Sequence, residues 1–271
     1  MMSSKKLLVG LCCAVTATFL NAGTAQAVTL PERAPAVFDF TQNWASNGIN
    51  NVANGNARVY QATSADLGVF NVRATAWTLK TSDSKVYASK LMVYDKGFGV
   101  ISSLSNDDEN GASGKHQIDN HVNKDFILLQ FDRQVKLTGA VFNTFDLSGT
   151  KDSDATIKYG TTPAFDWQSN LGLAGKTMTQ LNAMFEGTLS STTTDTGNRT
   201  AALNPLRFSG DVWMIGASWN GSGSDSRIDA FKISQIAAIP EPATWAMMIG
   251  GFGLVGGAMR RRTRQATAIA A

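Results

Sequence analysis

The chain has 271 residues, of which 24 are lysine or arginine and 21 are acidic, so its formal net charge is +3. The excess lies at the two ends: without Lys5, Lys6, Glu241 and the four arginines at 260–264, residues 28–239 hold 18 basic and 20 acidic side chains, a charge of about −2. A nucleic-acid-binding domain would present a basic patch or stripe, so this composition excludes that class.

The first twenty-seven residues have the three parts of a secretory signal peptide. Lys5 and Lys6 form a positive segment, Leu7–Leu20 is apolar, and Ala25 and Ala27 form a small-residue cleavage site. The apolar run of fourteen residues is short of the roughly 20 that a membrane-spanning helix needs. We therefore expect signal peptidase to cut after Ala27.

Cysteine usage agrees with the removal of this segment. Both cysteines, Cys12 and Cys13, lie in its apolar run, so the exported chain would contain no thiol. An oxidising compartment would then offer it no disulfide. Its fold must be held by a hydrophobic core or by an ion.

Short runs rich in Val, Tyr, Phe, Thr and Trp alternate with a period of two through the exported region, and Ser, Asp and Gly separate them. Strands are predicted at Val37–Phe40, Arg58–Gln61, Gly68–Lys80, Lys85–Tyr94, Phe126–Phe131, Gln134–Leu147, Ala155–Tyr159, Asp211–Trp219 and Arg227–Ile236. The run at 126–131 is the most hydrophobic and predicts a central strand. A short helix competes only at Leu171–Met184. The pattern predicts an all-β domain with a β-sandwich or jelly-roll-like fold.

The polar loop at 106–111 carries a candidate calcium site. Asn106, Asp108 and Asn110 place oxygen ligands at alternate positions before Gly111, the spacing with which one tight turn surrounds a hard cation, and Asp119 lies nearby. The match is partial, because an EF-hand loop begins with Asp and ends with a bidentate Glu. A solvated acidic turn between strands is the other interpretation.

The exported region shows no sharp nucleophile or acid/base motif, so we expect no enzyme. Two alternatives remain, a glycan-binding and a glycan-hydrolysing β-sandwich protein. Pairs of carboxylates are available for glycoside hydrolysis. Five tryptophans could stack on sugars or pack in the core: Trp44, Trp77, Trp167, Trp213 and Trp219.

The carboxyl-terminal segment joins three unlike pieces. Pro240, Glu241 and Pro242 form a rigid triplet, and an uncharged run from Ala243 to Met259 follows. Seventeen residues at 1.5 Å each span about 25 Å, which suits a single transmembrane helix. Trp245 lies at its outer edge. The arginines Arg260, Arg261, Arg262 and Arg264 follow its other end, which orients the carboxyl terminus to the inside.

The triplet, Trp245 with the following alanine, the glycine-rich span and the arginine cluster resemble the PEP-CTERM sorting signal, in its PEPxxWA form, of exopolysaccharide-associated proteins of Gram-negative bacteria. The body stretches NDDENG, DFILLQFD, DSDATIKYG and DAFKISQI are also similar to exosortase-dependent surface proteins. The resemblance implies recognition and cleavage by exosortase, a membrane protease-transpeptidase. The sorting residues it implies are Pro240, Glu241, Pro242, Trp245, Arg260, Arg261 and Arg262.

The resemblance also implies a route for the protein. The chain would cross the inner membrane, remain anchored there transiently, and then reach the cell surface or extracellular matrix as a structural or adhesive component associated with exopolysaccharide. We accordingly divide the chain into a signal peptide (1–27), an exported β-domain (28–238), a sorting signal (239–264) and a cytoplasmic tail (265–271).

Overall fold

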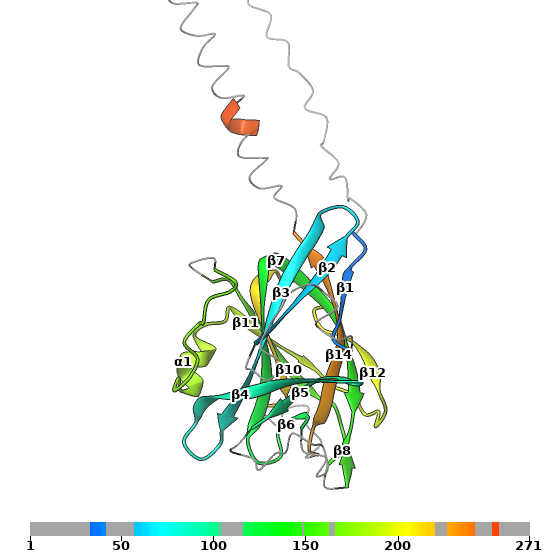
Figure 1. The fold of residues 1–271 in the computed structure, drawn as a ribbon, viewed down its shortest axis with the longest axis vertical. Coiled ribbons are helices and arrows are strands. Elements are labelled where there is room, and N and C mark those ends of the chain that lie inside the picture. Colours follow the sequence, from blue (N-terminus) through cyan, green and yellow to red (C-terminus); the bar gives the residue numbers. More distant parts are fainter. Residues whose placement is uncertain are drawn as a thin grey trace, which may run out of the picture. The chain divides into compact units, whose positions relative to one another are not determined.

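The computed structural model describes residues 33–41, 57–102, 104, 116–147, 149–162, 166–219, 227–241 and 251–254. These residues form fourteen strands, one short helix and a helical turn at 251–254, which confirms the predicted all-β class (Figure 1). The elements are β1 (Ala36–Asp39), β2 (Ala57–Ser64), β3 (Gly68–Lys80), β4 (Lys85–Tyr94), β5 (Gly97–Ile101), β6 (Ile118–Asp119), β7 (Lys124–Thr144), β8 (Asp146–Leu147), β9 (Thr150–Lys151), β10 (Ala155–Gly160), α1 (Met178–Asn182), β11 (Gly187–Ser191), β12 (Arg199–Ala202), β13 (Gly210–Ala217) and β14 (Ala230–Pro240).

Both ends of the chain that the sequence assigns to targeting lie largely outside this description. The predicted signal peptide at 1–27 is not described, and of the predicted anchor at 243–259 only 251–254 is described. A search of the described residues finds no helix with the length and apolar character needed to cross a bilayer. The signal peptide and the anchor therefore stay predictions.

Strand β7 is the centre of the fold. The sequence predicts two strands here, at 126–131 and 134–147, but β7 is one continuous strand of 21 residues. Asp132 and Arg133, between the two predicted strands, do not break it because both bond to β3. The Asp132 carboxylate accepts from the backbone N–H of Asn71 (3.0 Å), and Arg133 donates to the carbonyl of Val69 (3.1 Å).

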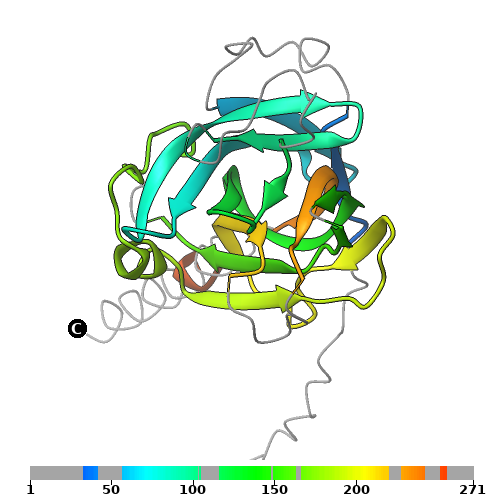
Figure 2. The same ribbon diagram turned by 90° about the horizontal axis from the view of Figure 1, so that it is seen from below.

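The two halves of β7 have different neighbours. Residues 124–131 pair with β3, and residues 126–130 and 135 pair with β13. Residues 135–144 pair with β14, and 139–142 pair with β12. Strand β14 also pairs with β5, which continues through β4 to β3, so the pairing makes a closed circuit (Figure 2).

The circuit closes where β5 meets β14, at the pair Phe98 and Ile233. Gly97 has φ +103°, and a Cβ built on it would overlap the carbonyl of Ile233. Glycine is needed here, since the left-handed region and the close approach each exclude a side chain.

Two apolar clusters cover the sheet. The inner cluster is rich in aromatic rings, including the stacked pair Phe40 and Phe98 at 4.0 Å between centroids. The second cluster joins Phe126 and Leu128 of β7 to Leu173 and Leu181. The buried run of residues 125–131 thus contributes to a cluster on each face, as fully covered strands do.

Helix α1 is shorter than the predicted 171–184. Gly172 and Gly175 adopt φ of +61° and +80°, which a helix cannot contain, so the helix starts only after Thr177. Thr177 and Gln180 then form a reciprocal capping box. Through Leu181 this short helix covers the second cluster.

Candidate functional site

The carboxyl-terminal triplet begins inside the sheet. Strand β14 runs through Pro240, two residues past the predicted end of the domain, with Ile239 opposite Lys136 and Pro240 opposite Val135. The next residue is still held, because the Glu241 backbone N–H donates to the carbonyl of Gln134 (2.9 Å). The first part of the triplet is therefore docked on β7 without a linker.

An ion pair adds to this docking. Lys136 Nζ lies 3.3 Å from a carboxylate oxygen of Glu241, and the two side chains are 33% and 22% exposed. Pro240 is itself buried, whereas Pro242, Trp245, Arg260, Arg261 and Arg262 lie outside the described residues, as do Ala25 and Ala27.

One edge of the docked segment has no strand partner within the described residues, although Ile239 and Pro240 are themselves buried. The pairing of β1 with β14 ends at Ala36 and Ala238, so Ile239 and Pro240 pair with β7 alone. Proline is tolerated on an edge strand because it cannot donate to a second neighbour. An open edge is also where an extended segment of another chain can add by strand pairing.

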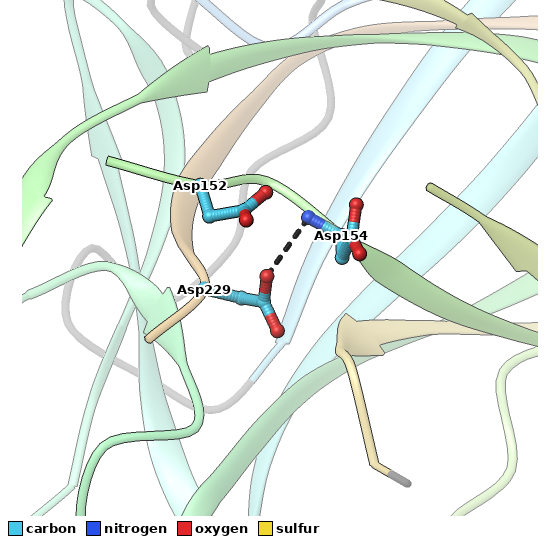
Figure 3. A group of neighbouring side chains, drawn as sticks. All are labelled: Asp152, Asp154 and Asp229. Atoms are coloured by element: carbon cyan, nitrogen blue, oxygen red, sulfur yellow. Dashed lines mark hydrogen bonds between the residues drawn. The ribbon is translucent and has the colours of Figure 1, made fainter. Parts of the chain in front are cut away.

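A second feature is a group of three buried carboxylates (Figure 3). Asp152 and Asp154 lie between β9 and β10, and Asp229 directly precedes β14. Each residue is 1% exposed, and one oxygen from each lies within 4.8 Å of the others. The fold thus brings Asp229 next to two acids 75 and more residues earlier in the chain.

Backbone and side-chain donors stabilise these carboxylates. Asp229 accepts from the backbone N–H of Asp154 (3.0 Å) and from the side-chain amide of Asn120 (2.7 Å). Asp154 accepts from the N–H of Thr193 (2.7 Å), and Asp152 from the N–H of Ser153 (2.7 Å). Such bonds favour the charged form of a carboxylate.

Burial nevertheless dominates the titration of Asp229. It raises the pKa of this carboxyl from 3.8 to about 7, and the charges of Asp152 and Asp154 add to the rise. Arg199 is close enough for these acids to raise its pKa, although burial lowers it by more. Its guanidinium bonds mainly to Ser153 and Ser191. Carboxylate oxygens in this arrangement could share a proton or hold a hard cation such as Ca²⁺.

Of the predicted calcium ligands, Asp119 alone falls in the described part of the chain. Asn106, Asp108 and Asn110 lie outside the described residues. Asp119 is buried in β6, where its carboxylate accepts from the N–H of His121 (3.0 Å) and where it pairs with Ala230, the residue after Asp229. The calcium loop therefore stays a prediction. Sequence reasoning missed the buried group: the D-x-D spacing of Asp152 and Asp154 was visible, but its third member is far away in the chain.

Tryptophans mostly serve the core. Trp77, Trp213 and Trp219 are 4%, 0% and 5% exposed, so these three do not present a stacking platform to solvent. Trp167 is half-buried, and Trp44 lies outside the described residues. Two cavities lie beside α1. The smaller, of about 140 Å³, is bounded by β10, β11 and Trp219, and the larger, of about 570 Å³, has mostly apolar walls that include Leu171, Met184 and Phe185.

Comparison with known proteins bears on the first of these features. Residues 238–262 match the family model of the PEP-CTERM protein-sorting motif, which confirms the resemblance seen in the sequence. The matched segment begins in β14, at the residue where β1 stops pairing with it. No curated protein and no solved structure matches the chain.

Proposed function

We propose that this chain, whose residues 238–262 carry a PEP-CTERM protein-sorting motif, serves as a structural or adhesive component of the cell surface or extracellular matrix, in association with exopolysaccharide. The motif supports an exported protein that exosortase sorts. The β-domain is then the part delivered, and its role is not catalytic. Signal peptidase would first remove residues 1–27, and the inner membrane would hold the carboxyl-terminal anchor transiently.

The observation that carries this proposal is the continuity between domain and motif. Because β14 ends inside the Pro-Glu-Pro triplet and Glu241 still bonds to Gln134, cleavage or transfer near the triplet would leave the folded domain at the new terminus. No long linker separates the domain from the point of processing. Such an arrangement suits a domain that is itself the cargo.

The open edge of Ile239 and Pro240 supports recognition at this place. A membrane protease must bind its substrate in an extended form, and Ile239 and Pro240 are already extended in β14, with one edge unpaired within the described residues. Glu241 adds a carboxylate at the end of this edge. We propose that Pro240, Glu241, Pro242 and Trp245 are read by exosortase, while Arg260, Arg261 and Arg262 hold the anchor in the correct orientation.

Processing of the full-length chain tests the proposal in a Gram-negative host that contains exosortase. We expect Glu241→Gln, or deletion of residues 260–264, to leave unprocessed protein in the membrane fraction and to lower the surface fraction at least tenfold. Glu186→Gln, a change at an exposed glutamate, is the matched control and should be processed normally. Normal processing of both sorting variants would refute the proposed role of the motif.

A glycan-hydrolysing enzyme is the rival to a structural role. The group of three carboxylates in the described residues is buried and so is a poor site for attack on a polymer. Incubation of the full-length protein with exopolysaccharide should therefore give binding without release of reducing ends. Release that a single carboxylate substitution abolishes would favour the enzyme instead.

A further inference from the structure

The smaller cavity beside α1 has a polar floor on the outer face of two neighbouring strands. Thr156 and Lys158 of β10 lie directly opposite Ser190 and Thr188 of β11 in the antiparallel register. Because side chains alternate along a strand, these four project to one face while Ile157 projects to the inner core. The remaining walls come from α1 and from the two residues that follow β13, namely Met178, Asn182, Ser218 and Trp219.

Lys158 is the chemical centre of this cavity. Its side chain is 7% exposed, and its ammonium donates to the hydroxyl of Thr188 (2.7 Å) and lies 5.7 Å from the centre of the Trp219 ring. Within the described part of the chain, no carboxylate comes within 4.0 Å of it. An ammonium has three donors, and among the described residues the hydroxyl of Thr188 is the one hydrogen-bond acceptor for them.

A buried cation without a counterion is unfavourable in a folded protein. The burial of Lys158 lowers its pKa, and no neighbouring acid opposes that change. A second amine lies behind the cavity wall, because Lys124 donates to the carbonyl of Trp219, and burial lowers its pKa as well. The cavity thus provides a positive, hydroxyl-lined place that would be stabilised by an anion.

We propose that this cavity binds the carboxylate-bearing ring of an acidic sugar, a uronic acid unit of an anionic polysaccharide. The carboxylate accepts from Lys158, and sugar hydroxyls exchange hydrogen bonds with Thr188, Ser190 and Asn182 at the rim. This inference deepens the proposed association with exopolysaccharide and rests on it for the identity of the polymer.

Size and wall chemistry favour a sugar over a bare ion. The volume is about 140 Å³, and a cavity of roughly 150 Å³ holds a benzene ring. The carboxylate-bearing side of a pyranose therefore fits, while its other hydroxyls lie at the opening. Thr188, Ser190 and Asn182 are exposed at the opening, and they provide both donors and acceptors. The lining contains no acidic side chain that would repel a carboxylate.

Calorimetric titration of the purified full-length protein in detergent tests this inference, with trigalacturonic acid as the probe and the neutral galactose trimer as its comparison. We expect trigalacturonic acid to bind, the neutral trimer to bind at least tenfold more weakly, and acetate not to compete at equal concentration. Lys158→Met keeps an unbranched stem and removes the charge, so it should weaken binding at least tenfold. Lys151→Met, at an exposed lysine of β9, is the matched control and should bind as the parent does.

Three results would overturn the inference: equal binding of the neutral trimer, full competition by acetate, or unchanged binding by Lys158→Met. The melting temperature of each variant shows whether it is folded, and Thr188→Val gives a milder second variant if Lys158→Met unfolds. Sorting is not needed in this experiment. If the protein is processed correctly but binds no uronate, the uronate inference fails and the sorting role stands. If it binds uronate but Glu241→Gln is still processed normally, the sorting role fails and the uronate site stands.

Discussion

The two halves of β7 belong to one strand but differ in burial and in the strands with which they pair. Residues 125–131 are buried one after another and lie between β3 and β13, whereas residues 135–144 alternate between buried and half-buried positions and hold β14. The first half has α1 and the second apolar cluster over its outer face. No residue of the second half belongs to that cluster in the part of the chain that the structure describes, and the sorting motif docks at its start. The difference teaches that the same strand supplies the core of the domain and the attachment point of its targeting signal.

The comparison implies that the first half carries more of the stability. Phe126 is fully buried and meets the Trp219 ring edge-on at 5.5 Å between centroids. Phe126→Ala should therefore lower the free energy of unfolding by about 3–5 kcal/mol, because it removes buried area and leaves a cavity. Val141→Ala, at a half-buried position in the second half, should cost about 1 kcal/mol or less. Urea unfolding of both variants measures the difference, and equal losses would contradict the contrast.

The end of β7 near Thr144 offers a test by pH. Strand β14 begins opposite this end, directly after the buried Asp229, whose pKa is raised to about 7. Since the folded chain holds this proton more tightly than the unfolded chain, the stabilisation is complete below about pH 4 and is lost as the pH rises through about 7.

Asp152→Asn sharpens this test, because it removes a charge that raises the pKa of Asp229. We expect the stability of the variant relative to the parent to rise by about 1–2 kcal/mol from pH 5 to pH 8. Denaturant unfolding at the two pH values measures this gain. Asp66→Asn, at an exposed acid, should show no such difference. If Asp152→Asn were instead less stable than the parent at pH 8, the charged carboxylate of Asp152 would be needed for stability, as a bound cation would require.

The sequence predicts the first half of β7 better than the second. The run Phe126–Phe131 is bounded by acids and is continuously apolar, so a buried central strand follows from periodicity alone. Gly68–Lys80 and Lys85–Tyr94 are confirmed with the same bounds. A strand past Asp132 was also predicted, but its unbroken junction with the first run was not, since that junction depends on a bond from Asn71 in another strand.

The sites divide in the same way. The sorting motif is local, so its residues are readable in order and the family model confirms it. The buried carboxylates and the cavity over Lys158 are not local: Asp229 reaches Asp154 across 75 residues, and Lys158 meets Trp219 only after β10 and β13 pair. No window of sequence contains either arrangement. The predicted calcium loop is local and therefore readable in the sequence, but it lies outside the described residues and stays a prediction.

The smallest expected effect separates docking of the motif from its recognition. Lys136 and Glu241 are each partly exposed, and such pairs contribute about 0–1 kcal/mol, so Lys136→Met should lower the free energy of unfolding by less than 1 kcal/mol. The backbone bond from Glu241 to Gln134 would still hold the motif on β7. We therefore expect Lys136→Met to be processed at the parent rate, whereas Glu241→Gln is not.

Pulse-chase processing of the two variants distinguishes the causes, because both remove the same ion pair but only one removes the carboxylate of the motif. If Lys136→Met blocked processing as strongly as Glu241→Gln, the ion pair on β7 would be the feature that exosortase requires. If Lys136→Met accelerated processing, docking would restrain cleavage, and the second half of β7 would set the rate at which the domain is released.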